Sequence, residues 1–150
     1  MTETYTSPVA LLLLALESLL TDETTLKPRF GLRCIEIGIA DVRPPAFPAA
    51  TLVAGITEQQ ENQEAAMSMA VVLTSRAVKS RTGVLGLADL AYTIKTEILE
   101  HSTELADGWD VSAELDIDPQ LVGRAGADND KGGKDLIYVA VINLTARRLE

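Results

Sequence analysis

The chain has 150 residues, 13 basic and 22 acidic side chains, a net charge of −9 and a single cysteine, Cys34. The length suits one domain with a hydrophobic core, so we treat residues 1–150 as a single domain. Its last two residues, Leu149-Glu150, are typical of the scar that a cloning site leaves before a purification tag. The negative charge excludes a general nucleic-acid binder, while the lone cysteine excludes an intrachain disulfide or a multi-cysteine metal site and favours a reducing compartment.

The first predicted element is an apolar helix that begins at Ser7-Pro8 and ends near Thr21. Serine is a favoured N-cap, and proline suits the first helical turn. Leucine and alanine occupy nearly every side of this helix, so we expect it to be buried almost all round, by its own sheet and by a neighbour. The uncharged run from Ser7 to Leu16 is too short to span a bilayer, and no Lys or Arg precedes it, so we expect neither a membrane anchor nor a signal peptide.

Three strands are predicted next. The first, Cys34–Val42, alternates so that three isoleucines share one face: Ile35, Ile37 and Ile39. The second, Thr51–Thr57, follows a proline-rich break, and the polar residues 58–64 after it are expected to form a hairpin tip. The third strand is Ala66–Val78.

The second half of the chain predicts a helix over Arg81–His101 and two strands, Trp109–Ile117 and Asp135–Arg147. The helix carries apolar residues three and four positions apart: Val84, Leu87, Ala88, Ala91, Ile94 and Ile98. The strand after it alternates strictly between apolar and polar residues, and the last strand is apolar on both faces, which favours an interior position. The order αβββαββ predicts an α/β (α+β) domain with a mixed, mostly antiparallel sheet and helices packed on it.

Residues 118–134 form a predicted connection that is longer than a hairpin needs, and most of it is the segment GADNDKGGKD at 126–135. A phosphate-binding loop would need a glycine in place of Asp128 and a hydroxyl in place of Asp135, and an EF-hand loop would need a glutamate in place of Tyr138. We therefore expect neither nucleotide nor calcium to bind here. Loops of this length are usually functional or disordered, so we expect a contact arm that becomes ordered on a partner.

No catalytic set is expected elsewhere in the chain. His101 is the only histidine and ends an acidic helix beside Ser102, and a Ser-His-Asp set is formally available through Ser102 or Ser112 with Asp107 or Asp110. Helix-end positions rarely bring a Ser-His-Asp set into register, and the negative end of a helix explains a histidine on structural grounds. We expect no enzymatic activity, no cofactor and no bound metal.

Several local patterns occur in a recognisable order. They are the near-terminal apolar helix, the Pro-x-x-x-Leu-Val pattern at Pro48 to Val53, Gly83-Val-Leu-Gly86 at the start of the second helix, and the closing IYVAVINLTAR strand at 137–147. Over most of its length the chain resembles the tail terminator and minor tail proteins of tailed bacteriophages. The resemblance implies an α/β domain that assembles as a hexameric ring at the head-proximal end of the tail tube, stops tube polymerisation and presents a surface for head attachment.

The resemblance also implies a virion protein of the tail or neck, assembled in the cytoplasm of the host bacterium. Its implied partners are further copies of itself, the tail tube protein and the head-tail connector, with DNA as a passenger through the channel and no membrane involved. The net charge of −9 and the carboxylates of residues 58–64 lead us to expect an acidic channel wall, which keeps DNA from sticking. Candidate contacts with neighbouring subunits or with the tube lie in the polar tip and the arm: Glu58, Glu61, Asn62, Glu64, Arg124, Asp128, Asp130, Lys131 and Lys134. Two alternatives stay open, a head completion or other neck-ring protein, and a small-molecule-binding or enzymatic domain of ferredoxin-like topology.

Overall fold

The computed structural model describes residues 4–22, 27–39, 44–54, 66–77, 79–124 and 136–149, and for Asp22 and residues 116–124 it describes the backbone alone. The helices in these ranges are α1 (Pro8–Leu20) and α2 (Ser80–Glu100). The strands are β1 (Thr21–Asp22), β2 (Lys27–Pro28), β3 (Cys34–Ile37), β4 (Ala49–Ala54), β5 (Ala66–Ala77), β6 (Trp109–Arg124) and β7 (Leu136–Arg148).

Among the described residues, five strands form one sheet in the order β3-β4-β5-β7-β6. β3 and β4 are parallel, and each of the other neighbouring pairs is antiparallel. β5 and β7 pair from Ala66 opposite Arg147 to Ala77 opposite Leu136, which makes β7 an interior strand as its two apolar faces predict. β1 and β2 form a separate short antiparallel pair that the sequence did not predict. The predicted α+β fold with a mixed, mostly antiparallel sheet is confirmed.

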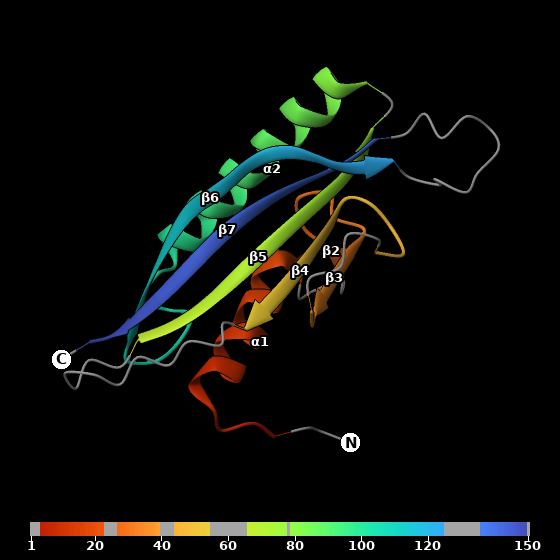
Figure 1. Cartoon of the computed structure of the whole chain (residues 1–150). Coiled ribbons are helices and arrows are strands. Elements are labelled where there is room, and N and C mark those ends of the chain that lie inside the picture. Colours follow the sequence, from red (N-terminus) through yellow and green to blue (C-terminus); the bar gives the residue numbers. More distant parts are fainter. Residues whose placement is uncertain are drawn as a thin grey trace.

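Both helices cover the same face of the sheet (Figure 1). α1 lies over β3 and β4, and α2 lies over β5, β7 and β6. The core forms where alternate strand residues meet the two helices, and its largest fully buried side chains are Leu12, Leu16, Leu20, Leu52, Leu73, Leu87, Ile94, Ile98, Ile142 and Leu144. The three-four spacing of α2 thus gives one continuous buried side, as the sequence predicts.

The first two strands of the sheet differ from the prediction. β3 ends at Ile37 instead of Val42, so Ile39 lies beyond the strand on which it was predicted to share a face with Ile35 and Ile37, and it is 88% exposed. The physical reason is that β3 is an edge strand, paired on one side only and over only four residues of β4. β4 begins at Ala49, two positions before the predicted Thr51. Residues 40–43 and 55–57 lie outside the described residues.

β6 corrects the predicted connection at 118–134. The strand continues past Ile117 to Arg124, whose backbone partner is Leu136, so residues 118–124 belong to the sheet and only 125–135 connect β6 to β7. Register shifts at three places break the two-residue period beyond Leu115, which is why the alternation seemed to end at Ile117. Pro119 lies at one of these shifts on an edge strand, a position where proline is tolerated.

α1 starts as predicted but is only partly enclosed. Ser7 occupies the N-cap position and Pro8 follows it, although the Ser7 side chain makes no capping hydrogen bond. Leu12 and Leu16 are fully buried, whereas Leu11 is 46% exposed. In the single chain the sheet covers one side of the helix and no other described element covers the opposite side, so the expected cover by a neighbour stays a prediction.

Candidate interaction surfaces

The contact residues predicted from the sequence lie almost entirely outside the described residues: Glu58, Glu61, Asn62, Glu64, Asp128, Asp130, Lys131 and Lys134. Arg124 is the exception, at the end of β6, where its backbone pairs with β7 and its side chain is not described. The structure therefore does not test these contacts.

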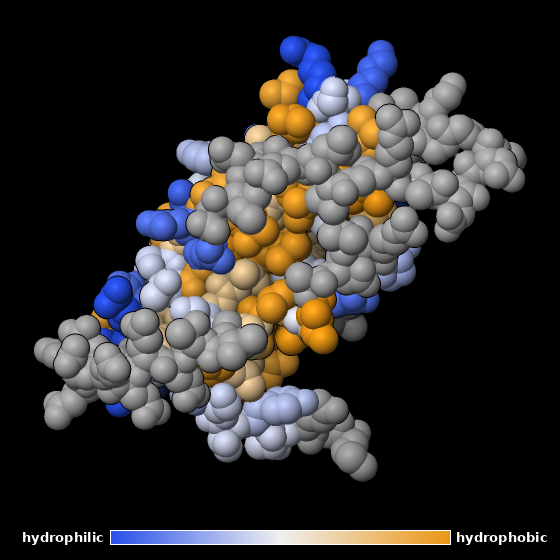
Figure 2. Space-filling model, in the orientation of Figure 1, coloured by the Kyte–Doolittle hydropathy of each residue, from blue (hydrophilic) through white to orange (hydrophobic). Residues whose placement is uncertain are grey.

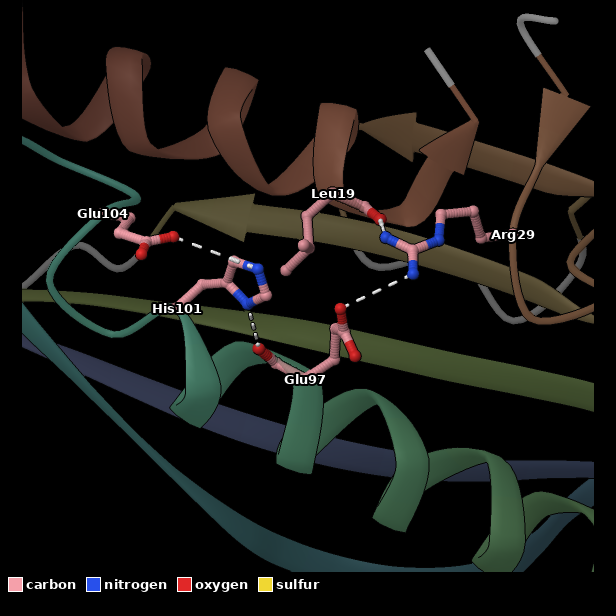
Figure 3. A network of polar contacts seen from close by, with 5 residues as sticks. All are labelled: Leu19, Arg29, Glu97, His101 and Glu104. Atoms are coloured by element: carbon pink, nitrogen blue, oxygen red, sulfur yellow. Dashed lines mark hydrogen bonds and ion pairs between the residues drawn. The ribbon is translucent and has the colours of Figure 1, made fainter. Parts of the chain in front are cut away.

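A polar network joins the C-terminal end of α1 to α2 (Figure 3). Nη1 of Arg29 donates a hydrogen bond to the carbonyl oxygen of Leu19 at 3.1 Å, and Nη2 lies 3.5 Å from Oε1 of Glu97. Nδ1 of His101 lies 3.1 Å from the carbonyl oxygen of Glu97, and its Nε2 lies 3.9 Å from Oε2 of Glu104. An exposed ion pair of this kind contributes about 0–1 kcal/mol, so the network orients the helices more than it stabilises them.

These contacts also determine which groups lie next to the ring nitrogens of His101. Both of its ring nitrogens face groups of the network, while Oγ of Ser112 donates to the carbonyl oxygen of Thr145 at 3.2 Å. Glu97, Glu100 and His101 do present possible metal-ligating atoms within 4.8 Å of one another. However, Arg29 already neutralises Glu97, so a cation would have to compete with an existing charge partner.

A cleft of about 480 Å³ separates α2 from the Phe30-Gly31 turn, with the end of β5 as its floor. Phe30, Leu87 and Leu90 provide apolar walls, and Asp89 is the acidic residue of its lining. The Ser75 hydroxyl in the floor is buried and has no hydrogen-bond partner among the described residues. A cleft of this size with an unbonded hydroxyl has the dimensions of a small-molecule site, although few polar groups converge on it.

A second hollow lies at the opposite side of the helix layer, between α1 and the edge strand β3. It measures about 430 Å³, and apolar side chains provide most of its lining. We call the surface around it the α1–β3 surface, defined by the residues that line the hollow: Tyr5, Ala10, Leu13, Leu14, Glu17 and Ile37. Tyr5 is 43% exposed and Ile37 is 39% exposed, so this surface is apolar and open to solvent because the sheet ends at β3.

α2 carries a further exposed apolar line that sequence reasoning missed. Leu85 is 55% exposed, Tyr92 is 70% exposed and Leu99 is 42% exposed. With intervening residues they form what we call the α2 seam, spaced alternately four and three apart: Arg81, Leu85, Ala88, Tyr92, Lys95 and Leu99. This spacing is typical of a helix-packing stripe, and the α2 seam runs along the helix beside the buried stripe. Of the residues of the seam, only Ala88 belongs to the stripe predicted from the sequence, so the apolar line of Leu85, Tyr92 and Leu99 was not predicted.

The α2 seam and the α1–β3 surface lie on opposite flanks of the molecule. Glu97 faces α1 through Arg29, and Leu99 is two residues further along, about 200° around the helix at about 100° per residue. Leu85 and Tyr92 share the flank of Leu99 because seven residues make nearly two turns. α1 lies at the β3 end of the sheet and α2 at the β6 end, so one surface marks each end.

The face of the sheet that no helix covers is also apolar along its middle (Figure 2). The side chains that strand alternation places there include Val72 from β5 and Val139 and Val141 from β7. Val72 is buried and the two β7 valines are half-buried. The described molecule therefore presents apolar side chains on a third surface.

Comparisons with known proteins do not assign this chain to a family. No family model matches it, and no similar sequence is found among curated proteins. Among the described residues, no helix has the length and apolar character needed to cross a membrane.

Proposed function

We propose that this protein is a structural subunit that assembles with copies of itself into a closed ring, and that the ring acts as a tail terminator of a tailed bacteriophage. The observation that carries the assembly is the pair of exposed apolar surfaces at opposite ends of the sheet, the α1–β3 surface and the α2 seam. Contiguous apolar surface on a small domain is typical of a protein interface. The place of the ring in the tail comes from the resemblance in sequence order and local patterns.

Two different surfaces on opposite flanks favour a cyclic assembly over a twofold dimer. A contact between unlike surfaces repeats from subunit to subunit, and it closes into a ring when the rotation per subunit fits. The resemblance makes sixfold closure the expected result. In this role the ring caps the head-proximal end of the tail tube and joins it to the connector, as part of the virion.

The charge of the chain suits a channel through which DNA passes. With a net charge of −9, the subunit would repel the phosphate backbone wherever acidic side chains line the channel. A basic lining would bind DNA and slow its passage. We therefore propose an acidic channel wall, with DNA as a passenger and without catalysis, cofactor or membrane.

The assembly and the tail role need separate measurements. Light scattering over a concentration series and negative-stain images of the purified protein should show rings of uniform size. Addition of those rings to growing tubes of the tail tube protein from the same virus should halt elongation. A strict monomer at high concentration would refute the ring, and rings that bind the head connector without affecting tube length would favour a head completion or other neck-ring protein.

The cleft beside α2 supports one alternative from another class, a small-molecule-binding domain. The cleft volume of about 480 Å³ and the Ser75 hydroxyl, which makes no hydrogen bond with the described residues, are the observations that favour this function. A thermal-shift screen with small polar molecules tests it. A ligand that stabilises the wild type but not a Ser75→Ala variant would support this function, and no stabilisation by any compound would leave the ring as the better proposal.

A further inference from the structure

We infer that the α1–β3 surface of one copy docks on the α2 seam of the next copy, and that this head-to-tail contact is the ring contact. The inference rests on the proposed function, because it specifies which two surfaces meet. It also predicts a property that assembly alone does not require: each surface has one partner, and that partner is the other surface.

The shapes of the two surfaces fit this pairing. The α1–β3 surface is a hollow of about 430 Å³ between a helix and a strand edge, with Ile37 in its wall. The α2 seam is a convex helical ridge whose most exposed side chain is the aromatic ring of Tyr92. A ridge enters a groove more completely than two ridges or two grooves can pack together, which is the basis of helix packing. Large aromatic side chains that enter a pocket also dominate the energy of protein contacts.

The charges disfavour contacts between like surfaces. Glu17 lines the hollow and is the one charged residue of α1, whereas the α2 seam contains Arg81 and Lys95. None of these three forms an ion pair with another described residue. Two α1–β3 surfaces face to face would bring carboxylates together, and two seams would bring cations together. The unlike pairing brings opposite charges together.

The acidic residues of α2 lie outside this pattern. Asp89 and Glu100 are displaced from Tyr92 by about 60° and about 80° around the helix, on the side away from Arg81 and Lys95. They border the seam along one side only. This leaves the apolar line and its basic positions continuous over the length of the helix.

The relative positions of the two surfaces give the contact its direction. One is at the β3 end of the sheet and the other at the β6 end, so a copy that docks by its α1–β3 surface presents a vacant α2 seam for the next copy. Such a chain of contacts ends only by closure. The same pair of surfaces therefore accounts for a ring without further contacts.

The test uses two full-length variants, each with one surface blocked at an exposed side chain. Ile37→Arg places a cation in the wall of the α1–β3 hollow, opposite the basic seam, and Tyr92→Glu places a carboxylate in the seam, opposite Glu17. The two side chains are 39% and 70% exposed, so folding should be spared, and thermal unfolding tests this. Thr93→Glu is the matched control, because it adds the same charge one residue away on the flank that faces the cleft.

We expect each blocked variant alone to be monomeric in native mass spectrometry, with association weakened at least about tenfold, while the Thr93→Glu control assembles like the wild type. An equal mixture of the two blocked variants should restore association between the unlike chains. The Ile37→Arg chain retains an intact seam and the Tyr92→Glu chain retains an intact α1–β3 surface, so these two surfaces can meet.

Three results would overturn the inference. They are normal assembly of either blocked variant, a homodimer formed by one blocked variant alone, and a mixture that stays monomeric. Each of these leaves the wild-type ring standing, so they refute the choice of surfaces and not the proposed function. A wild-type chain that never assembles would refute both.

Discussion

Two glycines of α2 provide a sharp test of how this helix sits on the sheet. Gly83 and Gly86 are one turn apart, neither has a positive φ, and both line the same cleft. A Cβ added at Gly83 would lie against Cε2 of Tyr138, 2.6 Å from Cδ2 of the same ring and 3.2 Å from Cβ of Ala77. A Cβ added at Gly86 would meet nothing within 4 Å. The same substitution should therefore have opposite effects at the two positions.

The expected magnitudes follow from these contacts. Alanine in place of a helix-interior glycine gains about 0.8–1 kcal/mol from helix propensity. At Gly86 nothing opposes this gain, so Gly86→Ala should raise the free energy of unfolding by about 0.5–1 kcal/mol. At Gly83 the ring of Tyr138 is only 2% exposed and cannot move aside, so overpacking should cost about 2–3 kcal/mol and leave a net loss of about 1–2 kcal/mol.

Urea or thermal unfolding of both variants measures the difference. Since about 1 kcal/mol moves the midpoint by roughly 2–4 °C in a protein of this size, Gly83→Ala should melt roughly 2–8 °C below the wild type and Gly86→Ala slightly above it. A Gly83→Ala variant at least as stable as the wild type would show that α2 does not pack on Tyr138 as described. A Gly86→Ala variant that loses stability would show that its side of the helix is enclosed.

Three further predictions concern other parts of the chain. Leu16 is fully buried and Leu11 is 46% exposed, so Leu16→Ala should cost about 2–5 kcal/mol of unfolding free energy and Leu11→Ala below about 0.5 kcal/mol in the monomer. Urea unfolding measures both losses, and equal losses would contradict a helix that the sheet covers on one side only. Burial raises the pKa of the Cys34 thiol, and the negative charge of Glu36 and a hydrogen bond with the Glu36 side chain raise this pKa further. Glu36→Gln should therefore lower the pKa of Cys34 and speed its alkylation by iodoacetamide at pH 8. An unchanged alkylation rate would refute the contact between Cys34 and Glu36. Calorimetry with Mg-ATP and with calcium should give only heats of dilution, because residues 126–135 lack the required motif positions, and micromolar binding of either would overturn this.

The elements that the sequence predicted well are those whose packing follows a regular period. α2 begins one residue before the predicted Arg81 and ends one residue before His101, because a 3.6-residue period over about six turns is hard to mistake. Trp109, Val111 and Ala113 are buried and their neighbours in β6 are exposed, as strict alternation requires. Prediction failed beyond Ile117, where register shifts change which residues face the core.

The sequence by itself determined the order of the elements and the residues that share a side of each one. It could not determine which sides the fold would leave uncovered, because that depends on where the sheet ends and how many helices lie on it. Leu85 and Leu87 are equally apolar, yet one is 55% exposed and the other 1%, since the sheet lies beneath only one of the two stripes of α2. Ile39 is exposed for a related reason, because it lies beyond the end of β3, which is the edge strand of the sheet formed by the described residues. The two candidate interaction surfaces form only in the tertiary structure, because the edge of the sheet and the positions of the helices decide which apolar side chains of each element stay uncovered.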